Sequence, residues 1–184
     1  MADKILYLIA QDHFRDEEYL VPRAMFESAG YGVTVAAPEL RECLGIVKTR
    51  VLPDLAIGQA DPKDYRAVVI AGGGGSKKYL WNNPDVLRLI QGAHRSGKAV
   101  GAICLSAALP AQAGLLKGKR GTVWPEPSAI RELEKNGVVY TESPVVVSDR
   151  IVTSPGPDHS RIFGQALLDL LTENTSNGKD RRAT

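Results

Sequence analysis

The stretch from Ala99 to Leu115, AVGAICLSAALPAQAGL, decides the fold of this chain. Its first part, Ala99–Cys104, is apolar throughout, which is typical of a parallel strand covered by helices on both faces. Its second part, Leu105–Leu115, is rich in small residues and indicates a helix. Cys104 falls where the strand ends and the helix begins, so the stretch predicts a buried strand that delivers a cysteine to the edge of a sheet.

The flanking sequence alternates short apolar runs with segments of helical period. Strands are expected at Lys4–Ala10, Gly32–Ala37 and Ala67–Ala71, and helices at Asp16–Ala29 and from Pro84 to the stop at Gly97. Such alternation indicates a parallel sheet whose strands are joined by crossover helices.

The second half of the chain continues this pattern in shorter segments. The expected elements are a helix at 127–136, short strands at 138–140, 145–147 and 151–153, and an amphipathic helix at 158–171. From residue 172 to 184 the sequence is polar, and we expect a mobile tail there. Residues 1–171 carry no repeat and no linker, so they are expected to form a single domain.

Composition excludes several classes of function. The chain has 184 residues and a formal net charge of +2, which provides no large basic field for binding nucleic acid. Ser106, Pro110 and Gln112 interrupt the most apolar stretch, so no membrane span is expected. Two cysteines cannot build a disulfide framework, and no Cys/His cluster has the spacing of a metal site. We therefore expect a cytoplasmic protein without a metal.

In open α/β sheets, ligands bind beyond the carboxyl ends of the strands. Four groups are expected at that edge: the acidic stretch Asp16–Glu18, the glycines Gly72–Gly75, Cys104, and the segment Pro155–His159. Candidate chemistry is therefore confined to these groups.

Cys104 and Glu18 each have a structural and a functional interpretation. A cysteine at a helix N-terminus has a lowered pKa, whereas a buried cysteine is often only a small apolar side chain. Glu18 lies in the first turn of a helix, where negative charge is favourable for structural reasons alone. Alternatively, its carboxyl group is protonated in an apolar niche and exchanges a proton with Cys104 or a substrate.

The glycines and histidines are weaker signals. The glycine run forms either a tight turn or a set of backbone N–H donors for an anionic oxygen, and it lacks the order of a nucleotide-binding motif. His13 and His159 are expected in loops at the same edge, where either is a possible base for Cys104 or simply a solvated side chain.

Four motifs in this order resemble the ThiJ/PfpI superfamily, which includes the DJ-1-like proteins and is related to class I glutamine amidotransferase domains. They are DEEYLVPRAMFESAG at 16–30, VVIAGGGG at 68–75, VGAICLSAALPAQAGLLKGKRGT at 100–122 and IVTSPGPDHSRIFGQALLDLL at 151–171. The resemblance covers the chain from Lys4 to about Leu171. It implies a flavodoxin-like, doubly wound α/β fold with helices on both faces, and a homodimer.

The resemblance also implies roles for individual residues. Cys104 matches the cysteine of the nucleophile elbow, and Glu18, four residues before Pro22, matches its partner glutamate. The backbone N–H groups of Gly73, Gly74 and Leu105 are then the oxyanion-hole donors. The implied activity is that of a glutathione-independent glyoxalase or deglycase, in which a cysteine attacks a small reactive carbonyl compound without a cofactor.

Three departures from the family pattern keep two other functions open. Leu105 stands where PfpI-type peptidases have a histidine after the cysteine, which ranks a cysteine peptidase or amidase last. Trp124, a further candidate for the pocket, stands in the segment where the DJ-1-like branch has a histidine. Pro155 stands where that branch has an arginine beside the Gly-Pro pair. The missing histidine favours a redox-responsive or chaperone-like stress protein in which Cys104 is oxidised.

Overall fold

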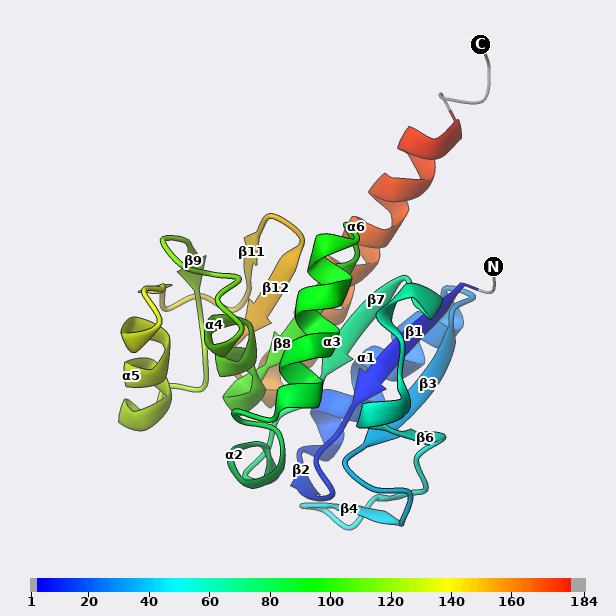
Figure 1. Cartoon of the computed structure of the whole chain (residues 1–184), viewed down its shortest axis with the longest axis horizontal. Helices are drawn as coiled ribbons and strands as arrows, with labels where there is room; N and C mark the ends of the chain where they lie inside the picture. Colours follow the sequence, from blue (N-terminus) through cyan, green and yellow to red (C-terminus); the bar gives the residue numbers. More distant parts are fainter. Residues whose placement is uncertain (1–2, 180–184) are drawn as a thin grey trace.

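The structure is a computed structural model that describes residues 3–179 of the chain. Its central sheet contains β1 (Lys4–Leu8), β3 (Gly32–Ala37), β6 (Leu55–Ala56), β7 (Ala67–Ile70), β8 (Ala99–Ile103), β11 (Val146–Ser148) and β12 (Ile151–Ser154). The strand order is β11-β12-β8-β7-β1-β3-β6 (Figure 1). Neighbouring strands are parallel except for the β11–β12 pair, which is antiparallel.

Helices cover both faces of this sheet. They are α1 (Asp16–Ser28), α2 (Gly75–Tyr79), α3 (Pro84–Arg95), α4 (Leu109–Gln112), α5 (Pro127–Lys135) and α6 (Ser160–Lys179). Figure 1 shows α3 in front of the sheet and α1 with α6 behind it. Glycine allows close packing on the α6 side, because a Cβ at Gly101 of β8 would lie 2.6 Å from a methyl carbon of Leu167. The expected α/β fold with helices on both faces is confirmed.

The buried strands follow directly from their sequence. Every residue of β7 and of β8 is buried, as expected for apolar strands in the middle of a doubly covered sheet. The helix expected after Asn83 is also present, and the Asn83 side chain accepts hydrogen bonds from the N–H groups of Asp85 and Val86.

Several small elements were not expected. One three-stranded sheet consists of β2 (Asp12–Phe14), β4 (Cys43–Gly45) and β5 (Arg50–Val51), and a two-stranded sheet pairs β9 (Arg120–Gly121) with β10 (Val139–Tyr140). The strand expected at 138–140 therefore lies outside the central sheet. Four short 3₁₀ helices complete the fold: η1 (Ile57–Gln59), η2 (Pro62–Asp64), η3 (Cys104–Ala108) and η4 (Pro157–His159).

The segment after Cys104 differs from the single helix expected at 105–115. It begins as the 3₁₀ helix η3 and becomes α-helical only in α4, with Pro110 as the second residue. Proline has no N–H to donate to the preceding turn, and it is tolerated best in the first turn of a helix. Pro110 therefore explains why the helix starts again at Leu109.

The last helix is longer than expected. α6 continues beyond Leu171 to Lys179, where Figure 1 shows it projecting from the body of the molecule. Adding residues to an existing helix needs no new nucleus, so a polar sequence can continue it. Of the tail expected at 172–184, residues 180–184 lie outside the described residues. No helix within residues 3–179 has the length and apolar character that a membrane crossing requires.

Candidate active site

The candidate site lies at the carboxyl ends of β1, β7 and β8. The chain leaves β1 toward β3 on one side, and it returns to place β7 on the other side of β1. This reversal creates the crevice in which doubly wound sheets bind their ligands. Glu18 follows β1, the glycine run follows β7, and Cys104 follows β8. The topology thus brings these three groups together, and the fourth expected group, Pro155–His159, follows β12 at the same edge.

Cys104 has the backbone geometry of a nucleophile elbow. Its φ is +59°, in the left-handed region that residues with a side chain rarely adopt, and it is only 7% exposed. Gly72 makes room for it: a Cβ at this glycine would lie 2.5 Å from Cys104 Cβ and 2.7 Å from Glu18 Oε2. Only glycine at position 72 lets the cysteine and the carboxylate lie this close.

Glu18 is fully buried next to this cysteine. Its Oε2 accepts a hydrogen bond of 2.8 Å from the backbone N–H of Gly72. Its Oε1 has no hydrogen-bond partner in the part of the chain that the structure describes. Burial raises the pKa of Glu18 to about 7, although the Gly72 N–H, the Cys104 side chain and the charge of Arg15 act in the opposite direction. The carboxyl group can therefore accept or release a proton at neutral pH.

A second interaction holds the backbone of Glu18. In a regular helix its carbonyl would accept a hydrogen bond from the residue four positions later, which is Pro22 and has no N–H. The hydroxyl of Tyr7, on β1, donates to this carbonyl instead, at 2.5 Å. Tyr7 is fully buried, so the first turn of α1 is tied to the centre of the sheet.

The thiol of Cys104 is not preformed as a thiolate. Burial raises its pKa to about 12, and the negative charge of Glu18 adds to this effect. The lowered pKa expected from a helix N-terminus is wrong, because burial and the charge of Glu18 outweigh the backbone donors at Cys104, the first residue of the short 3₁₀ helix η3. The backbone N–H groups of Gly73 and Leu105 act in the opposite direction and favour the charged sulfur.

Backbone anchors fix the direction of the Leu105 N–H. The N–H of Trp124 donates to the carbonyl oxygen of Cys104 at 3.3 Å. Because the peptide between Cys104 and Leu105 is planar and trans, this bond turns the Leu105 N–H to the opposite side, toward the sulfur. The indole N–H of Trp81 holds the next carbonyl, that of Leu105, at 2.9 Å.

Two buried hydroxyls join the elbow to the glycine run. Ser106 Oγ donates to the carbonyl of Ala71 at 2.7 Å, and Ser76 Oγ lies 2.9 Å from Ser106 Oγ. The N–H of Ser76 donates to the carbonyl of Gly73. The segment that carries the Gly73 N–H is thus fixed against the segment that carries Cys104.

A cavity of about 170 Å³ opens beside the thiol. Its lining residues are Arg15, Ile46, Gly73, Gly74, Cys104, Leu105, Trp124 and Pro157. Of the residues expected at the site, Gly73, Gly74, Leu105 and Trp124 are present here. Pro157 belongs to the segment Pro155–His159 that was expected at this edge, whereas Arg15 and Ile46 were missed by sequence reasoning. Arg15 directly precedes the acidic turn that was singled out, whereas Ile46 lies in the turn that joins β4 to β5 of the unexpected small sheet.

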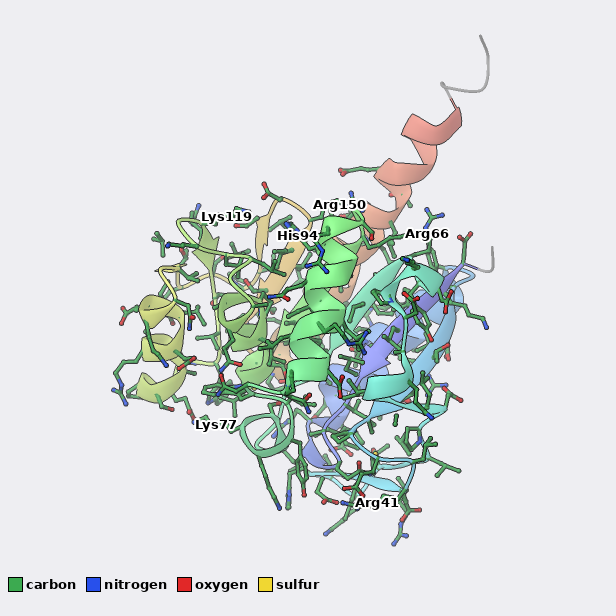
Figure 2. The ribbon with its side chains drawn as sticks, viewed as in Figure 1. Arg41, Arg66, Lys77, His94, Lys119 and Arg150 are labelled. Atoms are coloured by element: carbon green, nitrogen blue, oxygen red, sulfur yellow. The ribbon has the colours of Figure 1, made fainter. Side chains whose placement is uncertain are left out.

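The histidines lie elsewhere. Within the described residues, neither His13 nor His159 lines the cavity at Cys104: His13 is exposed, and His159 lines the neighbouring cavities beyond Trp124. Figure 2 shows His94, with Lys119 and Arg150, at the end of the molecule opposite Lys77 and the site edge. The structure therefore leaves Glu18 as the titratable partner next to Cys104.

Comparison with known proteins gives consistent matches along the chain. The model of the DJ-1/PfpI family matches residues 3–170. The uncharacterized protein MJ0967 of Methanocaldococcus jannaschii is 43% identical, over 93% of this chain and 83% of that protein. The putative cysteine protease YraA of Bacillus subtilis is 35% identical over 93% of this chain and 99% of that protein. Deglycase TK1284 of Thermococcus kodakarensis is 32% identical over 91% of this chain and 99% of that protein.

The fold has the same relatives. A ThiJ/PfpI domain protein from Brachyspira murdochii superposes with a TM-score of 0.88 at 28% identity, covering 94% of this chain and 98% of that one.

Proposed function

The chain belongs to the DJ-1/PfpI family, and from its paired Cys104 and Glu18 we propose that it is a cysteine-dependent enzyme that acts on small reactive carbonyl compounds, as a glutathione-independent glyoxalase or deglycase. The observation that carries this proposal is the unpartnered Oε1 of Glu18, buried beside the thiol. Relatives named deglycases at about 30% identity support it.

In the first step the Cys104 sulfur attacks the aldehyde carbon of methylglyoxal, taken as the simplest substrate. A C–S bond forms, the carbonyl π electrons move to oxygen, and the thiol proton goes to Glu18 Oε1. The N–H groups of Gly73 and Leu105 donate to the new oxyanion, with Gly74 in the cavity wall. Such donors typically contribute about a hundredfold or more in rate.

The later steps need only proton transfer and water. Glu18 first passes the thiol proton to the oxyanion. It then moves the proton from the former aldehyde carbon to the adjacent carbonyl carbon by way of an enediol, while the hydroxyl proton passes to the neighbouring oxygen, which leaves a thioester on Cys104. Water then cleaves the C–S bond, releases lactate and returns the proton to the thiol. A group with a pKa of about 7 suits this work, because a shuttle is most efficient when its pKa lies near the working pH.

The test is consumption of methylglyoxal without glutathione by the wild type, Cys104→Ala and Glu18→Gln. We expect saturable turnover by the wild type and none by Cys104→Ala. In Glu18→Gln the turnover should fall at least about a hundredfold, the size of a general acid–base contribution. Turnover that survives in Cys104→Ala overturns the proposal. In the wild type, kcat/KM should rise about tenfold per pH unit below pH 7 and level off above it, as Glu18 ionises.

A second candidate is a redox-responsive role for Cys104. The observation that favours it is that the Glu18 carboxyl group, partly protonated at neutral pH, can donate a hydrogen bond to an oxidised sulfur. Intact mass after mild peroxide treatment tests it: the wild type should gain two oxygen atoms, and Cys104→Ser should not.

A cysteine peptidase or amidase ranks third. The relative named a putative cysteine protease favours it. Leu105 replaces the histidine expected after the cysteine, and no histidine among the described residues lines the cavity, so the base would have to come from another subunit. Hydrolysis of casein by the wild type and not by Cys104→Ala would support this function.

We also propose a homodimer in the cytoplasm. Leu20 and Ile162, exposed apolar side chains of α1 and α6, support a self-association surface, and Leu20 borders an open groove of about 650 Å³. Cys43 and Cys104 are free, as is usual in a reducing compartment. Light scattering should give twice the chain mass for the wild type and a lower mass for Leu20→Asp.

A further inference from the structure

Two more cavities continue from the one at Cys104. The first, of about 240 Å³, shares Trp124 and Pro157 with the Cys104 cavity. The second, of about 400 Å³, shares Pro125, Pro155 and His159 with the first. The three cavities therefore adjoin one another in a row, called the path below, that leads from the thiol past Trp124.

Trp124 forms the wall between the thiol and this path. Its ring lies against Gly156, where an added Cβ would come within 2.8 Å of two ring carbons. Because glycine at 156 permits this close contact, the ring lies along the path. The space beyond it is far larger than a small carbonyl compound needs, since cavities of 300–1,000 Å³ hold ligands of drug size.

The far cavity contains a polar atom without a partner. Thr122 is 1% exposed and lines this cavity, and its Oγ1 has no hydrogen bond within residues 3–179. A buried hydroxyl without a partner costs free energy, and native structures seldom keep one without a reason. Its position in a cavity wall indicates that a bound molecule supplies the partner.

The two cavities beyond Trp124 are acidic. Glu142 lines the far cavity and Asp158 the middle one, and among the described residues no lysine or arginine lines either. Arg15 lines the Cys104 cavity, and a further adjoining cavity contains Lys119, which pairs with Asp149, and Arg120, which donates to the hydroxyl of Thr141. An acidic surface repels phosphates and attracts amines.

We propose that this path is a subsite for a polypeptide substrate, in which a carbonyl adduct reaches Cys104 while a neighbouring lysine or arginine of the same peptide binds beside Glu142 and Thr122. The inference rests on the proposed function, and it adds that the substrate is a modified peptide of basic character. Nucleic acid, whose phosphates the acidic residues repel, is the alternative that the test must exclude.

Binding can be measured without turnover. The probe is a fluorescein-labelled octapeptide with three lysines, compared with the same peptide carrying three glutamates and with a single-stranded oligonucleotide. The protein is the full chain with Cys104→Ser, and the readout is fluorescence anisotropy at about pH 8, where an ordinary histidine is neutral. We expect the lysine peptide to bind at least tenfold more tightly than the glutamate peptide, and less tightly as salt increases.

Variants locate the binding. In the Cys104→Ser protein, Glu142→Gln should weaken binding of the lysine peptide about threefold to fivefold, as expected for the loss of an exposed ion pair. The double variant Glu142→Gln with Asp158→Asn should weaken this binding about tenfold. Thr122→Val should weaken it about fivefold, as for one lost hydrogen bond. The matched control Glu134→Gln removes an exposed carboxylate of α5 that lines none of these cavities, and its affinity should stay within about twofold.

The two proposals fail in different ways. Equal binding of the two peptides, tighter binding of the oligonucleotide, or no binding up to roughly 1 mM overturns the subsite. With wild-type protein, turnover at equal KM of lysine and glutamate peptides that each carry one methylglyoxal-modified cysteine also overturns it while leaving the enzyme proposal intact. If the lysine peptide binds more tightly than the glutamate peptide but neither methylglyoxal nor either peptide is turned over, the enzyme proposal is overturned and the subsite is supported.

Discussion

The Tyr7 hydroxyl and the main-chain carbonyl of Glu18 form a buried hydrogen bond of 2.5 Å. Pro22 removes the helical donor that this carbonyl would otherwise use, so the tyrosine completes the first turn of α1 from the sheet below. The backbone of the proposed proton shuttle is therefore held by a residue that does not touch the reacting atoms. Tyr7 is a positioning residue in this arrangement.

Tyr7→Phe should lower the stability of the fold and also the pKa of Glu18. The free energy of unfolding should fall by about 1–3 kcal/mol, because a buried carbonyl loses its partner. If the loosened turn lets water reach Glu18, its pKa falls from about 7, and the midpoint of the pH dependence of kcat/KM moves to lower pH. Urea unfolding and a pH–rate profile measure the two effects.

Tyr31→Phe is the matched control, since Tyr31 is a half-buried tyrosine beyond the other end of α1. It should leave the midpoint of the pH profile in place. An unchanged midpoint in Tyr7→Phe, despite lower stability, would show that the tyrosine has a structural role only.

Glu18→Gln should stabilise the protein in a pH-dependent way. The pKa of Glu18 is about 7 in the folded chain and about 4.5 for a solvated glutamate, so between these values the folded state keeps a proton that the unfolded state releases. Stability is therefore unaffected below about pH 4.5 and decreases as the pH rises to 7, by up to about 3 kcal/mol. Glutamine has no charge to bury and avoids this loss.

Urea unfolding of the wild type and Glu18→Gln at about pH 4.5 and pH 8 measures this prediction. The variant should be clearly more stable than the wild type only at the higher pH, whereas Glu134→Gln, which changes an exposed carboxylate, should show no such gain. A difference between Glu18→Gln and the wild type that does not depend on pH would contradict the raised pKa.

Long apolar segments made the fold predictable from the sequence. The residues of β7 and β8 are apolar on both faces, and α3 carries its own cap at Asn83, so each segment indicates its structure without reference to distant parts of the chain. The strands β4 and β9 span only a few residues, and pairing with distant segments stabilises them. No local pattern of this sequence indicates such strands.

The candidate site was predictable where the topology alone positions a residue. The glycines, Cys104 and Glu18 each follow a buried strand, so their meeting at one sheet edge follows from the parallel sheet. The cavity wall was not predictable in the same way. Ile46 comes from the turn between β4 and β5, and the anchoring bonds of Tyr7 and Trp81 depend on side-chain geometry that periodicity does not contain.

Arg15→Gln should raise the pKa of Glu18. The charge of Arg15 lowers this pKa, and its removal should move the midpoint of the pH dependence of kcat/KM upward by a few tenths of a unit. The shift is small because the Arg15 side chain is 37% exposed and already pairs with Glu17. Arg50→Gln, an exposed arginine paired with Glu42, is the control and should leave the midpoint unchanged. A downward shift in Arg15→Gln would contradict the prediction.

The buried hydroxyls of Ser76 and Ser106 should be energetically coupled. Ser106→Ala leaves the Ala71 carbonyl and the Ser76 hydroxyl without partners and should cost about 1–3 kcal/mol of unfolding free energy. Ser76→Ala removes one hydrogen bond and should cost about 1 kcal/mol. Once Ser106 is alanine, removing the stranded Ser76 hydroxyl should cost almost nothing, so the double variant should lose about 1 kcal/mol less unfolding free energy than the sum of the single losses.

Urea unfolding of the wild type, both single variants and the double variant measures this coupling. Because the Ser76 N–H also holds the Gly73 carbonyl, the variants should lower kcat for methylglyoxal more than they raise KM, through displacement of the Gly73 donor. Strictly additive losses would show that the two hydroxyls act independently. A change in KM alone would show that they do not position the oxyanion donors.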